Sequence, residues 1–445
     1  MGISLQKIDA HVKEMVDDLV ENHIRIYGRD HQVISTLLTV FSALQLDFDG
    51  KTIRGWLDTL LFGESQTGKS ITATSILSMI KRGGYISGEG LSHVGLQGGI
   101  DKQGNSNVIR PGIFSIHDGE LVIVDEMQGI SKEEFGKLSD VRMSGVARIQ
   151  KVKSFRAPAR CRKIWTANPR PLESGSLTVK FSNDTFPINL VRKLIVTYED
   201  MTRFDIIVGY KQSDFSLRKQ QASTPRKNIY TPEIMSKMVN HVWSRSIHNY
   251  KFLPETVNAC FDISEYLIEN YTSDFPMILG AGQPDKMARL AAAAAGLFNL
   301  TAGETIEDYN NIVVYPEHVE WVSNWLQKVF KEDDLQYHAY AQAHNNSIKK
   351  SREDRKNIEK FIKKLPEYHE LIYALVNTMT INEYQLRTQA PSIVNVSKLL
   401  SILTRIGLLK ATNKGFYKTE LLNDMLQKEF ADGMETLGIL DLNDF

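Results

Sequence analysis

The sequence predicts an α/β domain with a largely parallel sheet, followed by a helical region and a small C-terminal domain. Strand-like and helix-like runs alternate from about residue 57 to 210, the pattern of a parallel sheet covered by helices. The glycine-rich segment GESQTGKS (63–70) lies between an apolar run and a helix-like run. A second apolar run, LVIV (121–124), ends in two adjacent acids, and the carboxyl ends of parallel strands are where open sheets bind ligands.

Residues outside the sheet are predicted from their periodicity and charge. Apolar residues at helical spacing in VISTLLTVFSALQL (33–46) predict a helical N-terminal segment over 1–50. The α/β core is expected over 51–225 and a helical region over 226–335, which includes the alanine-rich run KMARLAAAAAGLF. The charged stretch 336–355 is a predicted linker. Residues 356–425 show three helix-like runs and then two strand-like runs around a turn, the order of a winged helix, and 426–445 form an acidic tail.

The composition is that of an ordinary globular protein without a charge bias. The 445 residues include 53 basic and 53 acidic side chains, so any nucleic-acid contact must be local. Cys161 and Cys260 lie far apart, which excludes a disulfide framework and a cysteine-rich zinc site. The N-terminus is charged throughout and no apolar run is long enough to cross a bilayer. The sequence therefore predicts a cytoplasmic protein with no membrane contact.

The segment GESQTGKS has the spacing of a Walker A loop, in the strand-to-helix context that such a loop requires. Gly63 and Gly68 allow successive N–H groups to converge on phosphate oxygens. Lys69 is predicted to contact the β- and γ-phosphates of ATP, and Ser70 to contact Mg²⁺. The nucleotide contacts predicted from this loop are Gly63, Glu64, Ser65, Gln66, Thr67, Gly68, Lys69 and Ser70.

Three later positions complete a predicted ATP-hydrolysing site. Asp125 would bind the nucleotide's Mg²⁺ through a water, and Glu126 would polarise the attacking water as general base. Asn168, after the strand-like run KIWTA, could orient the same water. Arg203, before the strand-like run IIVGY, could stabilise charge on the transferring phosphoryl group. Each residue also has a plainer interpretation when taken alone: solvated acids, an Asn-Pro turn and a surface arginine.

Four segments, in order, resemble the AAA+ core of the minichromosome maintenance (MCM) family of replicative helicases. They are RIYGRD (25–30), IRGWLDTLLFGESQTGKS (53–70), TANP (166–169) and TRFDIIV (202–208). The resemblance implies an AAA+ P-loop ATPase domain with a helical lid, a C-terminal winged helix and a ring-shaped DNA helicase or translocase that uses ATP and Mg²⁺. It also implies a homo-oligomer, usually a hexamer, acting on single-stranded or forked DNA.

The resemblance assigns two catalytic arginines. Arg203 would be a finger that acts in trans on the nucleotide of the neighbouring subunit. Arg289 would be the sensor 2 residue of the lid, with Lys286 as the alternative, and an arginine on the polar face of the alanine-rich helix is an equally good interpretation of Arg289.

Two inserted hairpins are the candidate DNA contacts. Between the Walker motifs, turn residues 102–105 predict a hairpin that resembles the helix-2 insert of the MCM clade. After the acidic pair, VARIQKVKSFRAPAR (146–160) resembles the pre-sensor-1 hairpin. The predicted DNA-binding residues are Lys102, Arg148, Lys151, Lys153, Phe155 and Arg156. The alternative is a basic hairpin edge that serves only to prevent aggregation.

Several interpretations stay open at the level of sequence. Only 25 residues precede the Ile-Tyr-Gly triplet, so the family's N-terminal OB-fold and zinc region is absent from the chain, which suggests a minimal helicase of phage or mobile-element type, or one loaded by a partner. The acidic tail is either a frayed helix or a segment that competes with DNA or contacts a loader or replication partner. The competing functions are an AAA+ ATPase that remodels protein, and one that encircles duplex DNA without unwinding it in a regulatory or defence role.

Overall fold

The computed structural model divides the chain into two units, Met1–Asn345 and Asn346–Phe445. The residues that the structure describes are 3–103, 106–150, 154–170, 179–195, 197–212, 228–298, 310–346, 356, 360, 371, 374–375, 380–405, 408–412, 415–419 and 422–423. The boundary between the units falls inside the predicted linker 336–355. Tyr337 and Ala341, at the start of that stretch, are buried in the core of the first unit, so the first unit extends beyond residue 335.

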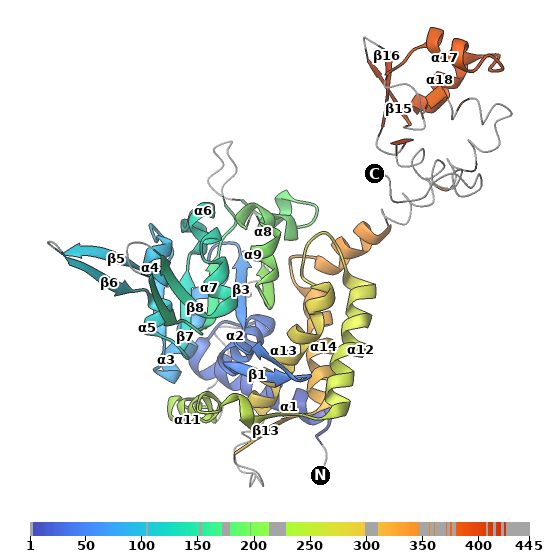
Figure 1. Ribbon diagram of the computed structural model, residues 1–445. Helices are drawn as coiled ribbons and strands as arrows, with labels where there is room; N and C mark the ends of the chain where they lie inside the picture. Colours follow the sequence, from blue (N-terminus) through green and yellow to red (C-terminus); the bar gives the residue numbers. More distant parts are fainter. Residues whose placement is uncertain are drawn as a thin grey trace. The chain divides into compact units, whose positions relative to one another are not determined.

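A five-stranded parallel sheet forms the centre of the first unit (Figure 1). In spatial order its strands are β11 (Ile206–Tyr210), β3 (Asp58–Gly63), β10 (Arg162–Ala167), β7 (Leu121–Asp125) and β4 (Gly84–Ser87). All neighbours in this sheet run parallel, so the carboxyl ends of all five strands lie at one edge. β10 is inserted between β3 and β7, which places the residues that follow it between the glycine-rich loop and the acidic pair.

Helices cover this sheet on both sides, as the alternating pattern predicts. Those of the α/β part are α1 (Leu5–Leu19), α2 (Asp30–Val40), α3 (Lys69–Ile80), α4 (His93–Gln97), α5 (Ile113–Ile116), α6 (Lys132–Gly136), α7 (Ser139–Ser144), α8 (Ile188–Leu194) and α9 (Tyr198–Thr202). The helical pattern over 33–46 overstates α2, because residues 45–48 form a strand instead. β1 (Gln45–Phe48) and β2 (Lys51–Arg54) pair around Asp49 and Gly50, which both have positive φ, 51° and 71°. An Asp-Gly pair favours such a two-residue hairpin turn over a continued helix.

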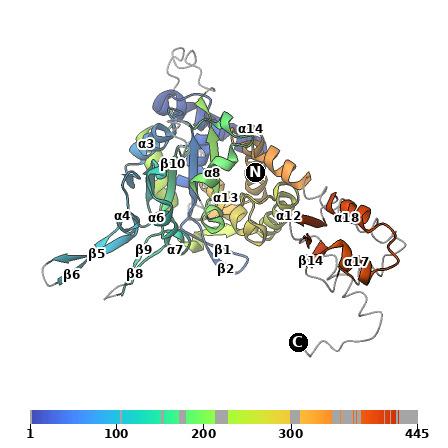
Figure 2. The ribbon, with the colours of Figure 1, turned by 90° about the horizontal axis from the view of Figure 1, so that it is seen from above.

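Two antiparallel hairpins interrupt the α/β part where the sequence predicts them. They are β5 (Gly98–Gln103) with β6 (Ser106–Pro111), and β8 (Val146–Gln150) with β9 (Ser154–Pro158). Figure 2 shows both hairpins projecting from the same side of the first unit. The prediction that the turn begins at Lys102 is wrong, because Lys102 and Gln103 continue the β5 ladder opposite Asn107 and Ser106.

The helical region packs against α2 through its alanine-rich helix. Its described elements are α11 (Pro232–Trp243), β12 (Tyr250–Phe252), α12 (Pro254–Tyr271), α13 (Gln283–Phe298), β13 (Ile312–Val314) and α14 (Pro316–Glu332). The alanines of α13 are fully buried, and a Cβ at Gly296 would lie 2.9 Å from the carbonyl oxygen of Phe41. Small side chains therefore allow α13 to approach the end of α2 closely.

The second unit has a small core of its own. Its described elements are β14 (Thr380–Ile381), α17 (Glu383–Gln389), α18 (Val396–Arg405), β15 (Leu409–Thr412) and β16 (Gly415–Lys418). The three strands form an antiparallel sheet in the order β14-β16-β15, and Leu386, Leu400 and Leu403 are buried beside it. A winged helix stays a prediction here, and the acidic tail 426–445 lies outside the described residues.

Candidate nucleotide site

A cavity of about 310 Å³ lies at the carboxyl edge of the sheet. Its lining comes from Ser65, Gln66, Thr67, Gly68, Lys69, Ser70 and Ile71, from Asp125 at the end of β7 with Glu126 and Gln128 after it, and from Thr166 and Ala167 of β10 with Asn168 after them. The volume is within the range of small-molecule sites. Three motifs predicted from separate stretches of sequence thus share one cavity.

The glycine-rich loop takes a backbone path that its two glycines permit. Gly68 has φ of 87°, and a Cβ there would lie 2.5 Å from the Ile26 side chain. A Cβ at Gly63 would lie 2.5 Å from the carbonyl oxygen of Tyr210 on β11. The loop is therefore wedged between Ile26 of the RIYGRD segment and the neighbouring strand. A side chain at either glycine would displace the loop from the position that lines the cavity.

Glu64 fastens the loop to its surroundings and does not line the cavity. One carboxylate oxygen accepts a hydrogen bond from the amide of Phe181 at 2.7 Å, and the other from the amide of Gln212 at 2.8 Å. Gly63 also lies outside the cavity lining. The carbonyl oxygens of both residues accept hydrogen bonds from Lys69, so Gly63 and Glu64 affect the cavity by holding that side chain.

Lys69 is held inside the loop by oxygen atoms of the loop itself. Its Nζ donates to the carbonyl oxygens of Gly63 at 3.0 Å and Glu64 at 2.7 Å, and contacts Thr67 Oγ1 at 3.1 Å. Burial lowers the pKa of Lys69 to about 8, although the charge of Asp125 acts to raise it. A buried ammonium with only neutral oxygen partners is poised to bind an anion, since phosphate oxygens would supply the missing negative charge.

Asp125 is surrounded by hydroxyl groups. Its Oδ1 accepts hydrogen bonds from Ser70 Oγ at 2.6 Å and from Thr166 Oγ1, and its Oδ2 accepts one from Tyr85 OH at 2.7 Å. Burial acts to raise the pKa of Asp125, but these hydrogen bonds outweigh it and the pKa is lowered. An ionised carboxylate beside a loop hydroxyl is the donor set that suits Mg²⁺ with bound water.

Glu126 lines the cavity in an unusual backbone conformation. Its φ of 54° lies in the left-handed region, and its amide donates to Thr166 Oγ1 at 3.1 Å. Burial, and then the nearby Glu89, raise the pKa of Glu126. A carboxylate with a raised pKa at the cavity wall is suited to general-base catalysis.

Asn168 follows β10 between the glycine-rich loop and the acidic pair. Asn168 lines the cavity, and its backbone N–H donates a hydrogen bond to Gln128 Oε1 at 3.0 Å. Residues two apart on a strand share a face, so the position of Asn168 could have revealed Thr166, which sequence reasoning missed. Tyr85 was also missed, and no motif marks its edge strand.

The comparisons with known proteins agree with this geometry. A family model described as the MCM P-loop domain matches residues 4–217. The chain carries an MCM-family P-loop core. Similar curated proteins include "DNA replication licensing factor MCM3" of Entamoeba histolytica, 27% identical over 41% of this chain and 29% of that protein. The mcm2 and mcm4 licensing factors of Schizosaccharomyces pombe are 26% and 22% identical, over 51% and 61% of this chain and 24% and 31% of those proteins.

The alignments therefore span about a quarter to a third of the length of these relatives. An MCM P-loop domain implies nucleotide binding, and the described cavity lies within the matched residues 4–217. Within the part of the chain that the structure describes, no helix is long and apolar enough to cross a membrane.

Arg203 lies at the opposite edge of the sheet of the MCM core. It precedes β11, whose residues Ile206 to Tyr210 pair in parallel with Thr59 to Gly63, so it stands near the start of β3 while the loop stands at its end. The strands separate the two by about 15–20 Å. Arg203 Nε instead donates to the carbonyl and hydroxyl oxygens of Ser139, both at 2.8 Å. Arg203 cannot reach the cavity of its own chain from this position.

Arg289, which lies beyond the matched residues 4–217, is buried and paired within its own chain. Its Nε and Nη2 contact Asp205 Oδ1 at 3.0 and 2.7 Å. Lys286, the alternative, is also buried and donates to the carbonyl oxygen of Met277 at 2.8 Å. Neither side chain lines the nucleotide cavity. The sensor 2 assignment stays a prediction, and the position of Arg289 indicates a role near the finger motif.

The β8–β9 hairpin presents basic side chains on one face. Arg148 and Arg156 are direct cross-strand partners, so they share a face, while Phe155 points to the other. Both arginines are exposed, and Arg148 pairs with Asp140 at 2.9 Å. Gln97, beside β5, donates to the carbonyl oxygen of Arg148 at 2.9 Å and links the two hairpins. The side chains of Lys102, Lys151 and Lys153 lie outside the described ones.

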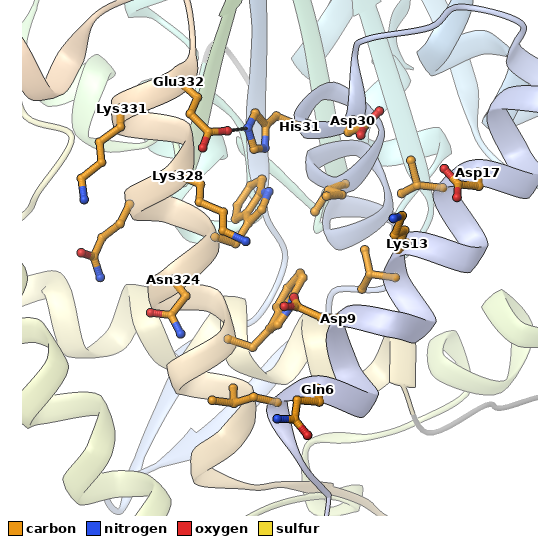
Figure 3. Close-up of a pocket in the computed structure, with 17 residues that line it drawn as sticks. Gln6, Asp9, Lys13, Asp17, Asp30, His31, Asn324, Lys328, Lys331 and Glu332 are labelled. Atoms are coloured by element: carbon orange, nitrogen blue, oxygen red, sulfur yellow. Dashed lines mark hydrogen bonds and ion pairs between the residues drawn. The ribbon is translucent and has the colours of Figure 1, made fainter.

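A second cavity, of about 730 Å³, lies between α1, α2 and α14 (Figure 3). The indole of Trp321 donates to Asp9 Oδ1 at 2.7 Å and stacks on Trp325. At the other end, His31 Nε2 contacts Glu332 at 3.3 Å. No predicted site residue lines this cavity, so it is separate from the nucleotide site.

Proposed function

We propose that this chain is an ATP hydrolase that drives translocation along DNA or its unwinding, as a ring-shaped homo-oligomer of MCM type, typically a hexamer. The observation that supports the proposal is that the predicted catalytic residues lie at the two opposite edges of the sheet. The cavity joins the loop, the acidic pair and Asn168 at the carboxyl edge, whereas Arg203 is held at the amino edge. Such a set is completed only when two subunits meet head to tail.

The roles of the residues follow from their positions. The loop amides and Lys69 bind the phosphates of ATP, and Ser70 and Asp125 would hold Mg²⁺, which would neutralise charge on the phosphoryl oxygens. Glu126 accepts a proton from the attacking water, and Asn168 orients that water. Arg203 of the neighbouring subunit then stabilises charge on the transferring group.

The paired hairpins supply the candidate DNA contact. Arg148 and Arg156 face each other across β8–β9, a repulsive arrangement of like charges that the ion pair of Arg148 with Asp140 offsets in part and that a bound phosphate would offset further. In a ring, each subunit would add such a pair and create a continuous basic track for single-stranded or forked DNA. A loader or replication partner for the acidic tail belongs to the same proposal.

The decisive experiment is unwinding of forked DNA with 3′ or 5′ tails, beside ATP-driven translocation on intact duplex. Strand separation that needs ATP and is lost in Glu126→Gln supports a helicase. ATP-driven movement on duplex without separation supports a translocase that encircles DNA. DNA-independent ATP hydrolysis with neither activity would refute DNA as the substrate and favour a protein-remodelling ATPase.

A further inference from the structure

Tyr85 makes a contact with the acidic pair that no sequence motif indicates. It lies on β4, at the free edge of the sheet next to β7, and its OH donates to Asp125 Oδ2 at 2.7 Å. The phenol is 48% exposed, so burial of the ring is not what fixes it there. The contact is a hydrogen bond to a charged acceptor, which is stronger than one between neutral groups.

The two oxygens of Asp125 have different partners. Oδ1 accepts from Ser70 and Thr166, which both line the cavity, whereas Oδ2 accepts from Tyr85, which does not. A carboxylate with hydrogen bonds on one oxygen only can rotate about its terminal torsion. A donor on each oxygen prevents this rotation and fixes the plane of the carboxylate.

We propose that Tyr85 is a positioning residue for Mg²⁺, holding Oδ2 of Asp125 so that the carboxylate stays aligned with Ser70 and a metal-bound water. The inference rests on the proposed function, since it concerns the same nucleotide site. A carboxylate offers about four acceptor sites, so the three hydroxyl donors leave capacity for a metal-bound water. Partners of this kind orient metal ligands, and their loss typically weakens metal binding about 10–100-fold.

The phenol has the length that this role requires. Tyr85 pairs with Ile123 in the β4–β7 ladder, two residues before Asp125, so its hydroxyl reaches the carboxylate diagonally across the two strands. A threonine or serine at this edge position would be too short to span the distance from β4 to the end of β7.

The test uses Tyr85→Phe, which removes the hydroxyl and keeps the exposed ring. A fluorescent, non-hydrolysable ATP analogue is bound to the full chain in EDTA, and Mg²⁺ is then titrated. We expect the affinity for the analogue in EDTA to match that of the unaltered chain. The Mg²⁺ concentration that produces half of the increase in affinity, the Mg²⁺ midpoint, should rise about tenfold.

The matched control is Tyr266→Phe. Tyr266 is 46% exposed and its OH also donates one hydrogen bond, to Gln327 Oε1 at 3.2 Å, but it lies on α12 and lines neither cavity. This variant should leave both the EDTA affinity and the Mg²⁺ midpoint unchanged.

Three results would overturn the inference. An unchanged Mg²⁺ midpoint in Tyr85→Phe would show that the contact does not position the carboxylate. A lower midpoint would show that the phenol competes with the metal, and weaker binding in EDTA would show that Tyr85 touches the nucleotide. If the unaltered chain binds the analogue with no response to Mg²⁺, the metal site of the proposed function fails, which is a separate outcome.

Discussion

The strongest test of a catalytic site shared between subunits is to disable Lys69 in one subunit and Arg203 in another, and then to mix the two variants. Lys69→Ala removes the ammonium that the loop holds 2.7 Å from the Glu64 carbonyl, and so removes nucleotide binding. Arg203→Ala removes a guanidinium at the opposite edge of the sheet and leaves the cavity intact. Each variant alone should be inactive, because an arginine finger contributes on the order of 10³-fold or more to the rate.

Mixing the two variants should restore activity in a predictable amount. Each interface takes the loop from one subunit and the finger from the next. In a random equal mixture, about half of the subunits keep an intact Lys69 and the other half keep an intact Arg203. About one quarter of the interfaces therefore combine an intact Lys69 with an intact Arg203. Turnover per subunit should therefore approach about a quarter of that of the unaltered chain. A finger that acted within its own chain would restore nothing, since every subunit lacks one half.

The assay is steady-state phosphate release as the mixing ratio varies, with mass photometry to confirm that subunits exchange. Activity should peak at equal amounts and fall to zero at both ends. Arg192→Ala serves as control, because Arg192 is a partly exposed arginine paired with Asp274 at 3.0 Å, and this variant should be active alone. Exchange without recovered turnover would refute the assignment of Arg203 to the neighbouring site.

Three further predictions follow from the same geometry. Glu126→Gln should keep ATP binding but lower turnover about 10²–10⁴-fold, and near-normal turnover would contradict its role as general base. Alanine at both Arg148 and Arg156 should weaken DNA binding and reduce the slope of log affinity against log salt by roughly two units, whereas an unchanged slope would place the DNA track elsewhere. Arg142→Met should lower the free energy of unfolding by about 3–5 kcal/mol, because it leaves Asp58 as a buried charge; both side chains are fully buried and 2.8 Å apart. Arg148→Met, which breaks an exposed pair, should cost less than about 1 kcal/mol, and equal losses in the two denaturation curves would contradict this reasoning.

The residues that line the cavity could be predicted from the sequence because the glycine-rich motif requires a backbone path that only glycine allows at two positions. Gly63 and Gly68 occupy positions where a Cβ would collide with Tyr210 or Ile26, so their spacing records a tertiary constraint. The hairpins were found for a similar reason, since strand patterning around short turns is a local property. The position of the turn in the β5–β6 hairpin was not predicted correctly, because pairing with β6 extends the β5 strand through Lys102.

Contacts between residues that are far apart in the sequence could not be predicted from any motif. Tyr85 reaches Asp125 across neighbouring strands, and nothing in its own segment marks that contact. Glu64 lies within a motif of phosphate ligands, yet its carboxylate binds two amides elsewhere in the chain. A motif predicts the path of the backbone. The contacts of side chains at its variable positions, such as Glu64, depend on parts of the chain that the motif does not include.

The amino edge of the sheet, far from the cavity, holds a concentration of buried charge. Arg142 contacts Asp58 at the start of β3, donates to the carbonyl oxygen of Asp200 at 3.2 Å and lies over the ring of Phe204. The indole of Trp165, on β10, also donates to Asp58. These contacts fix the segment around the finger to two strands whose other ends border the nucleotide cavity.

Asp205 extends this support to the helical region. Arg54 contacts both oxygens of Asp205 and donates to the carbonyl oxygen of Arg203 at 3.1 Å, while Arg289 approaches Asp205 from α13. A guanidinium that acts on another subunit must be held by its own, because each ångström of misplacement lowers the rate. Buried ion pairs contribute little net stability, so their concentration around Arg203 is better explained by positional precision than by folding energy. The same reasoning gives Arg289 a use that does not require it to touch nucleotide, since its contact with Asp205 joins the helical region to the backbone that carries the proposed finger, Arg203.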